Sequence, residues 1–193
     1  MPKSISSLME SRIMTDSQNR LKIRTHIEDY YILAVEYAGK DVITYRAENM
    51  KNNREVYLHE YFPESIAKRH YTSDDDCIVY AHPSQNELFD TKKLEFKTLY
   101  NNLKLVNHPS IPIIYELFES SGTLYVATKY TANTKSIAHQ LRVSMKTFSQ
   151  QHIEMLLLNL VRAFSLLQQH EVQIESLNLD NILIDNITQV PLL

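Results

Sequence analysis

Polar side chains that could do chemistry gather in one stretch near the carboxyl end of the chain. Residues 174–184 carry Glu175, Ser176 and Asp180 between a long apolar segment and the β-branched run 182–184. A serine becomes a nucleophile when a neighbouring base accepts its proton, and no histidine stands at a spacing that would serve Ser176. We therefore expect no nucleophile here, and expect the two carboxylates to be exposed or to cap backbone groups.

Two other groups of polar residues lie earlier in the chain. His59 stands in the apolar run 56–62, where a histidine is usually a core residue with satisfied hydrogen bonds. The acidic residues 74–76 could suggest a metal site, but no further oxygen ligands follow at a suitable spacing. We expect a solvated loop at this run, and no metal site.

Composition limits the class of protein. A chain of 193 residues suits one domain or a compact pair of lobes. The net charge of −3 gives no reason to expect binding to nucleic acid or to an anionic membrane, and no apolar run approaches the roughly 20 residues that span a bilayer. The single cysteine, Cys77, is typical of a reducing compartment, so a cytoplasmic protein is expected.

Glycine is scarce. The chain has two, Gly39 and Gly122, where average usage of about 7% would give roughly 13. A loop that cradles phosphates needs several glycines, because its backbone must approach the phosphate closely and adopt positive φ. The composition therefore excludes a full glycine-rich cradle.

The first half of the chain predicts a sheet. Residues 1–28 are polar without sustained periodicity, and we expect a mobile N-terminal arm. The runs 30–37, 42–47 and 56–62 are rich in β-branched and aromatic residues and are separated by good turn sequences, which predicts three antiparallel strands. Residues 64–90 are polar, and we expect irregular structure there.

A helix and two more strands are expected next. Asp90 is a candidate N-cap for a helix that stops before Pro109, and its apolar residues share one face. The runs 113–118 and 124–130 predict a hairpin whose turn contains Gly122.

The strongest helix signal follows. Residues 148–169 carry a broad apolar stripe, and Thr147 and Gln150 stand at capping-box spacing before it. A short helix at 136–143 is expected ahead of it. The runs 182–184 and 190–193 predict a closing hairpin.

The short sequence motifs in these elements resemble those of the bacterial serine/threonine protein kinases. Residues 60–63 read E-Y-F-P, as after the strand-three lysine of that group, and residues 108–111 resemble the H-P-N-I that follows its regulatory helix. Residues 118–125 resemble the turn before the hinge strand, and residues 180–184 resemble the end of the catalytic loop. The resemblance covers about residues 30–193.

The resemblance implies an α+β fold. Residues 29–130 would form a kinase-like small lobe, a five-stranded antiparallel sheet with one helix, after the arm 1–28. Residues 131–193 would form a truncated helical large lobe that ends before the D-F-G position.

The same resemblance implies that the catalytic positions are degenerate. Kinase chemistry depends on charged groups placed around the phosphates. Here His59 stands at the strand-three lysine, Leu99 at the glutamate of the regulatory helix, and Ser176 at the catalytic aspartate. Tyr37 and Val42 replace two glycines of the glycine-rich loop. We therefore expect a pseudokinase, not an enzyme, without a cofactor and without ATP binding.

Three kinase positions keep a suitable residue. Gly39 remains from the glycine-rich loop, Thr128 lies at the hinge, and Asn181 stands at the metal-binding asparagine. These residues leave one alternative open, a nucleotide-binding switch or a divergent ATP-dependent enzyme that uses the cleft between the lobes.

The function we expect from the resemblance is protein binding. A catalytically inactive kinase-like scaffold or regulator would work in bacterial signalling or secretion control, and its partner would be another protein or a second copy. Because the chain ends before the helix that would cover the helix 148–169, we expect part of its apolar face to be an interface. The residues of that expected interface are Ile153, Leu156, Leu160, Phe164 and Leu167.

Overall fold

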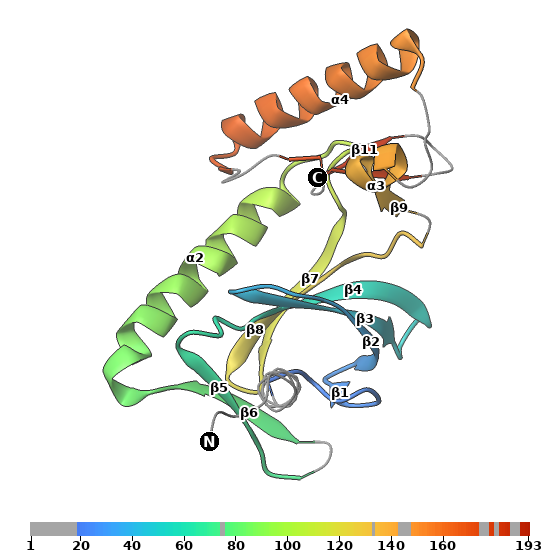
Figure 1. Cartoon of the computed structure of the whole chain (residues 1–193). Helices are drawn as coiled ribbons and strands as arrows, with labels where there is room; N and C mark the ends of the chain where they lie inside the picture. The colour runs from blue at the N-terminus through green and yellow to red at the C-terminus, as the bar shows by residue number, and fades with distance from the viewer. Residues whose placement is uncertain are drawn as a thin grey trace, which may run out of the picture. The chain divides into compact units, whose positions relative to one another are not determined.

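In a computed structural model, the chain folds into two compact units (Figure 1). The first unit holds the described residues up to Lys97 together with Tyr115–Thr128, and the second holds Thr98–Ile114 and the described residues from Lys129 onward. The expected division at residue 130 therefore differs from the structure in the segment Thr98–Ile114. The described residues are 19–73, 76–132, 134–142, 148–173, 178–179, 182–185 and 190–193.

A six-stranded sheet, in the order β1-β2-β3-β4-β8-β7, is the centre of the first unit. The pairs β1–β2, β2–β3 and β3–β4 are antiparallel. The sequence predicted a sheet of five strands, and the observed sheet has six, with β1 at one edge. The strands are β1 (His26–Ile27), β2 (Tyr30–Ala38), β3 (Val42–Asn49), β4 (Arg54–Tyr61), β7 (Ile114–Ser120) and β8 (Thr123–Lys129).

Alternation of side chains explains why the central strands form. Ile43, Tyr45 and Ala47 of β3 are buried on one face, and their neighbours along the strand are partly exposed. Strand β8 is different, because six of its seven residues are buried. A strand buried on both faces reads as a continuous apolar run, as residues 124–127 do.

The β7–β8 turn depends on a glycine. Ser121 and Gly122 both have positive φ, 51° and 78°, as a tight hairpin turn requires. A Cβ on Gly122 would lie 2.3 Å from the carbonyl oxygen of Val79. Gly122 therefore allows the hairpin to approach the neighbouring strand β6 (Cys77–Ala81), and the Val79 amide donates a hydrogen bond to the Ser121 carbonyl at 2.7 Å.

Residues 19–28, which the sequence analysis assigned to the arm, belong to the first unit. Leu21, Thr25 and Ile27 are buried, and β1 pairs with β2. Three isolated buried positions in a polar stretch show no period, which is why the sequence pattern did not indicate them. Residues 1–18 lie outside the described part of the chain.

Regular structure also occurs within residues 64–90, where an irregular segment was expected. Strands β5 (Ala67–Tyr71) and β6 (Cys77–Ala81) form a two-stranded antiparallel sheet. A 3₁₀ turn, Pro83–Gln85, then leads into α2 (Asn86–Lys104), which begins four residues before the expected N-cap Asp90. Strand β5 was hidden from pattern analysis because Arg69 lies between Ala67 and Tyr71 on its inward face.

The second unit combines helices with a three-stranded sheet in the order β11-β10-β9. Ser149 is the N-cap of its long helix and accepts a hydrogen bond from the His152 amide at 3.3 Å; the predicted cap Thr147 lies outside the described residues. Within the described residues, no helix is both long and apolar enough to cross a membrane. The elements are β9 (Thr134–Ser136), α3 (Ile137–Arg142), α4 (Gln150–Gln169), β10 (Leu183–Asp185) and β11 (Pro191–Leu192).

A small apolar core holds the second unit together. Ala163 and Leu167 of α4 pack with Val106, Ile111 and Val172. The amide of the last residue, Leu193, donates to the Ser110 carbonyl at 2.9 Å and brings the end of the chain to this core.

Candidate functional site

His59 joins three strands of the first unit. It is half-buried in β4, directly opposite Thr44 of β3. Its Nδ1 lies 3.0 Å from the Thr44 hydroxyl, and its Nε2 lies 2.9 Å from the hydroxyl of Thr128 in β8. Both ring nitrogens are therefore engaged by threonine hydroxyls, as expected for a structural histidine with satisfied hydrogen bonds.

This environment keeps the imidazole neutral. Burial lowers the pKa of His59 from its ordinary value of 6.5 to about 4. In a neutral imidazole one nitrogen donates and the other accepts, and a threonine hydroxyl can serve either role. At neutral pH the His59 ring is therefore uncharged.

The β2–β3 connection is a short turn around Gly39. Only residues 39–41 separate the two strands, and the Gly39 amide donates to the Val42 carbonyl at 2.8 Å. A Cβ on Gly39 would lie 2.8 Å from a ring carbon of Tyr37. The aromatic ring therefore occupies the space beside the one glycine, and that glycine's N–H is used within the hairpin.

The other predicted catalytic positions are distributed differently. Leu99 lies on α2 in the second unit and is exposed. Ser176 and Asn181 lie outside the described residues, as do Glu175 and Asp180. Thr128, one of the candidates for nucleotide contacts, is bonded to His59. Among the described residues, no three His, Cys, Asp or Glu side chains gather closely enough to hold a metal ion.

The expected interface residues on α4 do not share one environment. Leu156, Leu160 and Leu167 are buried, and Phe164 packs partly against the core of the second unit. Ile153 is exposed. Leu157 and Val161 follow it at intervals of four residues, so these three exposed side chains form a second apolar stripe beside the buried one.

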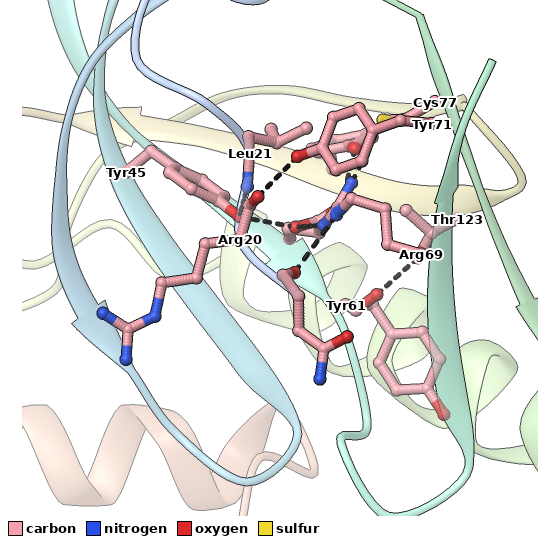
Figure 2. A network of polar contacts seen from close by, with 11 residues as sticks. Arg20, Leu21, Tyr45, Tyr61, Arg69, Tyr71, Cys77 and Thr123 are labelled. Carbon is pink, nitrogen blue, oxygen red and sulfur yellow. Dashed lines mark hydrogen bonds and ion pairs between the residues drawn. The ribbon is translucent and has the colours of Figure 1, made fainter. Parts of the chain in front are cut away.

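A buried ion pair was missed by sequence reasoning. Glu60 follows His59 in β4, and its side chain and that of Arg69 are both fully buried. The Arg69 Nη2 atom lies 2.5 Å from the Glu60 carboxylate. Tyr45 and Tyr125 donate their hydroxyls to the same carboxylate at 2.9 and 2.7 Å; Tyr45 and Arg69 are labelled in Figure 2.

The Glu60 carboxylate changes the pKa values of the groups that surround it. Burial alone would lower the pKa of the Arg69 guanidinium, but the Glu60 carboxylate outweighs it and holds that pKa above its ordinary value. Burial and the same carboxylate raise the pKa values of Tyr45 and Tyr125. Both phenols therefore stay protonated and act as donors. The available signal in the sequence was a carboxylate inside the apolar run 56–62, which needs a buried partner.

Comparison with known proteins identifies a solved structure with a similar fold. No protein-family model matches the chain, and none of the curated proteins matches it either. Among solved structures, the chain is similar to the apo form of PpkA-294, a bacterial Ser/Thr kinase fragment, at a TM-score of 0.77 and 25% sequence identity. The match covers 91% of this chain and 60% of PpkA-294. The likeness supports a kinase-like relationship, and the curled sheet of the first unit is compatible with a kinase small lobe.

Proposed function

We propose that this chain is a kinase-like protein that does not carry out ordinary phosphoryl transfer and acts by binding another protein. The observation that carries the proposal is His59. By resemblance it stands where a kinase places the lysine that pairs with the phosphates, and here its ring is neutral and bound to Thr44 and Thr128. A neutral donor cannot stabilise the charge that develops during phosphoryl transfer as an ammonium does.

The hairpin before it supports the same conclusion. Tyr37 lies close to Gly39, and the Gly39 amide is bonded within the turn. A triphosphate needs free backbone N–H groups and close approach of the backbone. The two observations are independent, since one concerns a side chain of β4 and the other a turn between β2 and β3.

The protein-binding part of the proposal rests on α4. Ile153, Leu157 and Val161 are 46%, 57% and 64% exposed, and Met155 and Leu158 on the same helix are also exposed. Apolar side chains that are exposed together usually mark an interaction site. A partner protein with a complementary apolar face would cover them, in bacterial signalling or secretion control in the cytoplasm.

Thermal unfolding with ATP, ADP and ATP–Mg²⁺, paired with a phosphate-transfer assay, tests the proposal. Nucleotide at 100 times its dissociation constant would stabilise the chain by roughly 2.7 kcal/mol, which raises the melting temperature by about 5–11 °C. We expect no shift up to millimolar nucleotide and no phosphate transfer. A shift of that size would favour the nucleotide-binding switch, and transfer of phosphate would overturn the proposal.

A further inference from the structure

Residues 19–22 form a short segment within the first unit, which we call the strap. Three side chains from strands β3 and β5 form hydrogen bonds with the backbone of the strap. The Nε atom of Arg69 lies 3.1 Å from the Asn19 carbonyl, and the Tyr71 hydroxyl donates to the Arg20 carbonyl at 2.5 Å. The Leu21 amide donates to the hydroxyl of Tyr45 at 3.0 Å. We call Tyr45, Arg69 and Tyr71 the strap site. Figure 2 shows these side chains converging on the strap from β3 and β5.

The strap site is built into the sheet independently of the strap. The Glu60 carboxylate, itself fully buried, accepts hydrogen bonds from both Tyr45 and Arg69. Arg69 also donates to the sulfur of Cys77 at 3.3 Å, which fixes its guanidinium on the facing strand β6. Two of the three side chains that meet the strap, Tyr45 and Arg69, are thus positioned by interactions that do not involve the strap.

The strap site makes few demands on the sequence that it binds. Its three hydrogen bonds go to two carbonyls and one amide of consecutive residues, which any extended peptide offers. Leu21 is the one fully buried side chain of the strap, at 2% exposure, and the Lys22 ammonium lies 4.9 Å from the centre of the Tyr71 ring. The same segment of another copy meets all of these demands.

The link between strap and sheet has an unfavourable backbone conformation. Arg24 has φ of 77°, a region that residues with a Cβ adopt at a cost. The Arg24 amide nevertheless donates to the Ile32 carbonyl at 2.9 Å, so the chain from Arg24 onward stays on its own sheet. Strain at such a short connection favours exchange of the preceding segment between copies.

We propose that the strap site binds the strap of a second copy of this chain, so that two copies exchange residues 19–22 and pivot at Arg24. The exchanged contacts are the same ones that the strap makes within one chain. The inference concerns none of the residues of the proposed kinase-like function and holds whether or not the chain binds nucleotide.

A labelled peptide with the sequence of residues 19–25 tests the strap site on the full-length chain by fluorescence anisotropy. In the wild-type chain its own strap competes at the millimolar effective concentration of a tethered segment. Leu21→Asp removes the competing strap but leaves the strap site intact. We expect the peptide to bind Leu21→Asp at least ten-fold more tightly than wild type. Ile23→Asp is the matched control, because Ile23 is 61% exposed, and it should behave like wild type.

Light scattering at increasing protein concentration then tests the second copy as the occupant. Wild type and Ile23→Asp should show a dimer fraction that rises with concentration, and Leu21→Asp should stay monomeric. A wild-type chain that is monomeric at every concentration overturns the proposal, and so does a peptide that binds Leu21→Asp no better than wild type. If Leu21→Asp does not melt cooperatively, Leu21→Ala replaces it, with the same ordering expected.

Discussion

Burial lowers the pKa of His59 to about 4, so the folded chain keeps this ring neutral at pH values where the unfolded chain protonates it. Between pH 4 and 6.5 the unfolded state therefore binds more protons than the folded state. The free energy of unfolding should fall as the pH drops through this window. Above pH 6.5 the ring is neutral in both states, and its contribution to stability is fully present.

This pH dependence can be removed by one substitution. His59→Gln keeps a donor and an acceptor for Thr44 and Thr128 but cannot titrate. Between pH 7 and 4.5, wild type should lose roughly 2–3 kcal/mol more stability than His59→Gln, since one pKa unit corresponds to about 1.4 kcal/mol. Urea unfolding at the two pH values measures the difference. His70→Gln, at an exposed position of β5, should retain the wild-type dependence; equal slopes for all three chains would contradict the assignment.

Sequence reasoning at the residue scale succeeded where the answer depended on neighbours along one strand. His59 in an apolar run was expected to be a hydrogen-bonded core histidine, and the structure shows it bonded on both sides. Glu60 is the opposite case, because its partners Tyr45, Arg69 and Tyr125 come from three other strands. Nothing in the spacing of these residues predicts that they meet. The pairing follows only from the sheet order and from the position of β5.

At the scale of elements, strand β3 was predicted well because one of its faces is buried and the other is not. The alternation in β3 and the turn residues on either side of it located that strand within two residues. Strand β5 was missed because the charged Arg69 lies between Ala67 and Tyr71 on the inward face and interrupts the apolar alternation. Tertiary pairing with Glu60, rather than local pattern, allows a charged residue at an inward position.

Helix α4 shows how periodicity can locate a helix without separating its two faces. The apolar residues were expected to lie partly in the core and partly in an interface. In the structure the stripe with Leu156, Leu160 and Leu167 is buried, and the stripe with Leu157 and Val161 is exposed. Both stripes follow the same helical period, so only packing against the rest of the second unit distinguishes them.

An aspartate should have a different effect on stability in each of the two stripes. Leu160→Asp places a carboxylate in the core, and we expect a loss of at least about 3 kcal/mol, because truncation of a buried leucine alone costs about 2–5 kcal/mol. Val161→Asp, one residue on and 64% exposed, should change stability by less than about 0.5 kcal/mol. It should instead reduce self-association or binding of a partner.

Chemical unfolding and light scattering of the two α4 variants separate these effects. A Val161→Asp chain that is as unstable as Leu160→Asp would mean that the second stripe is packed within the chain. A stable Val161→Asp chain with unchanged assembly and unchanged partner binding would remove this stripe from the proposed interface.

For the whole molecule, the order of motifs was more informative than any one of them. Residues 60–63, 108–111 and 180–184 are each short, yet their spacing resembles that of a kinase, and the fold is similar to the PpkA-294 kinase fragment. The catalytic state is a different matter, because it depends on several charged groups at once. Ser176 and Asn181 lie outside the described residues. The absence of phosphoryl transfer therefore stays a prediction.

Because the proposed inactivity is spread over several positions, restoring one charge should not restore nucleotide binding. In His59→Lys, the new ammonium would replace a neutral ring between Thr44 and Thr128 in a half-buried site, where burial disfavours its charge. By resemblance, Leu99 stands at the position of the glutamate that would pair with it. The Gly39 amide of the β2–β3 turn would still be bonded to the Val42 carbonyl, beside the Tyr37 ring.

We therefore expect His59→Lys to be less stable than wild type at pH 7 and to show a melting temperature that ATP–Mg²⁺ shifts by less than about 2 °C, well below the roughly 5–11 °C of saturated binding. Thermal unfolding with and without nucleotide measures both effects, and His59→Gln serves as the uncharged control. A full-sized shift in His59→Lys alone would show that this one position blocks the nucleotide. A single substitution would then be enough for this chain to bind nucleotide, and neither the turn beside Gly39 nor Leu99 would prevent a triphosphate from binding.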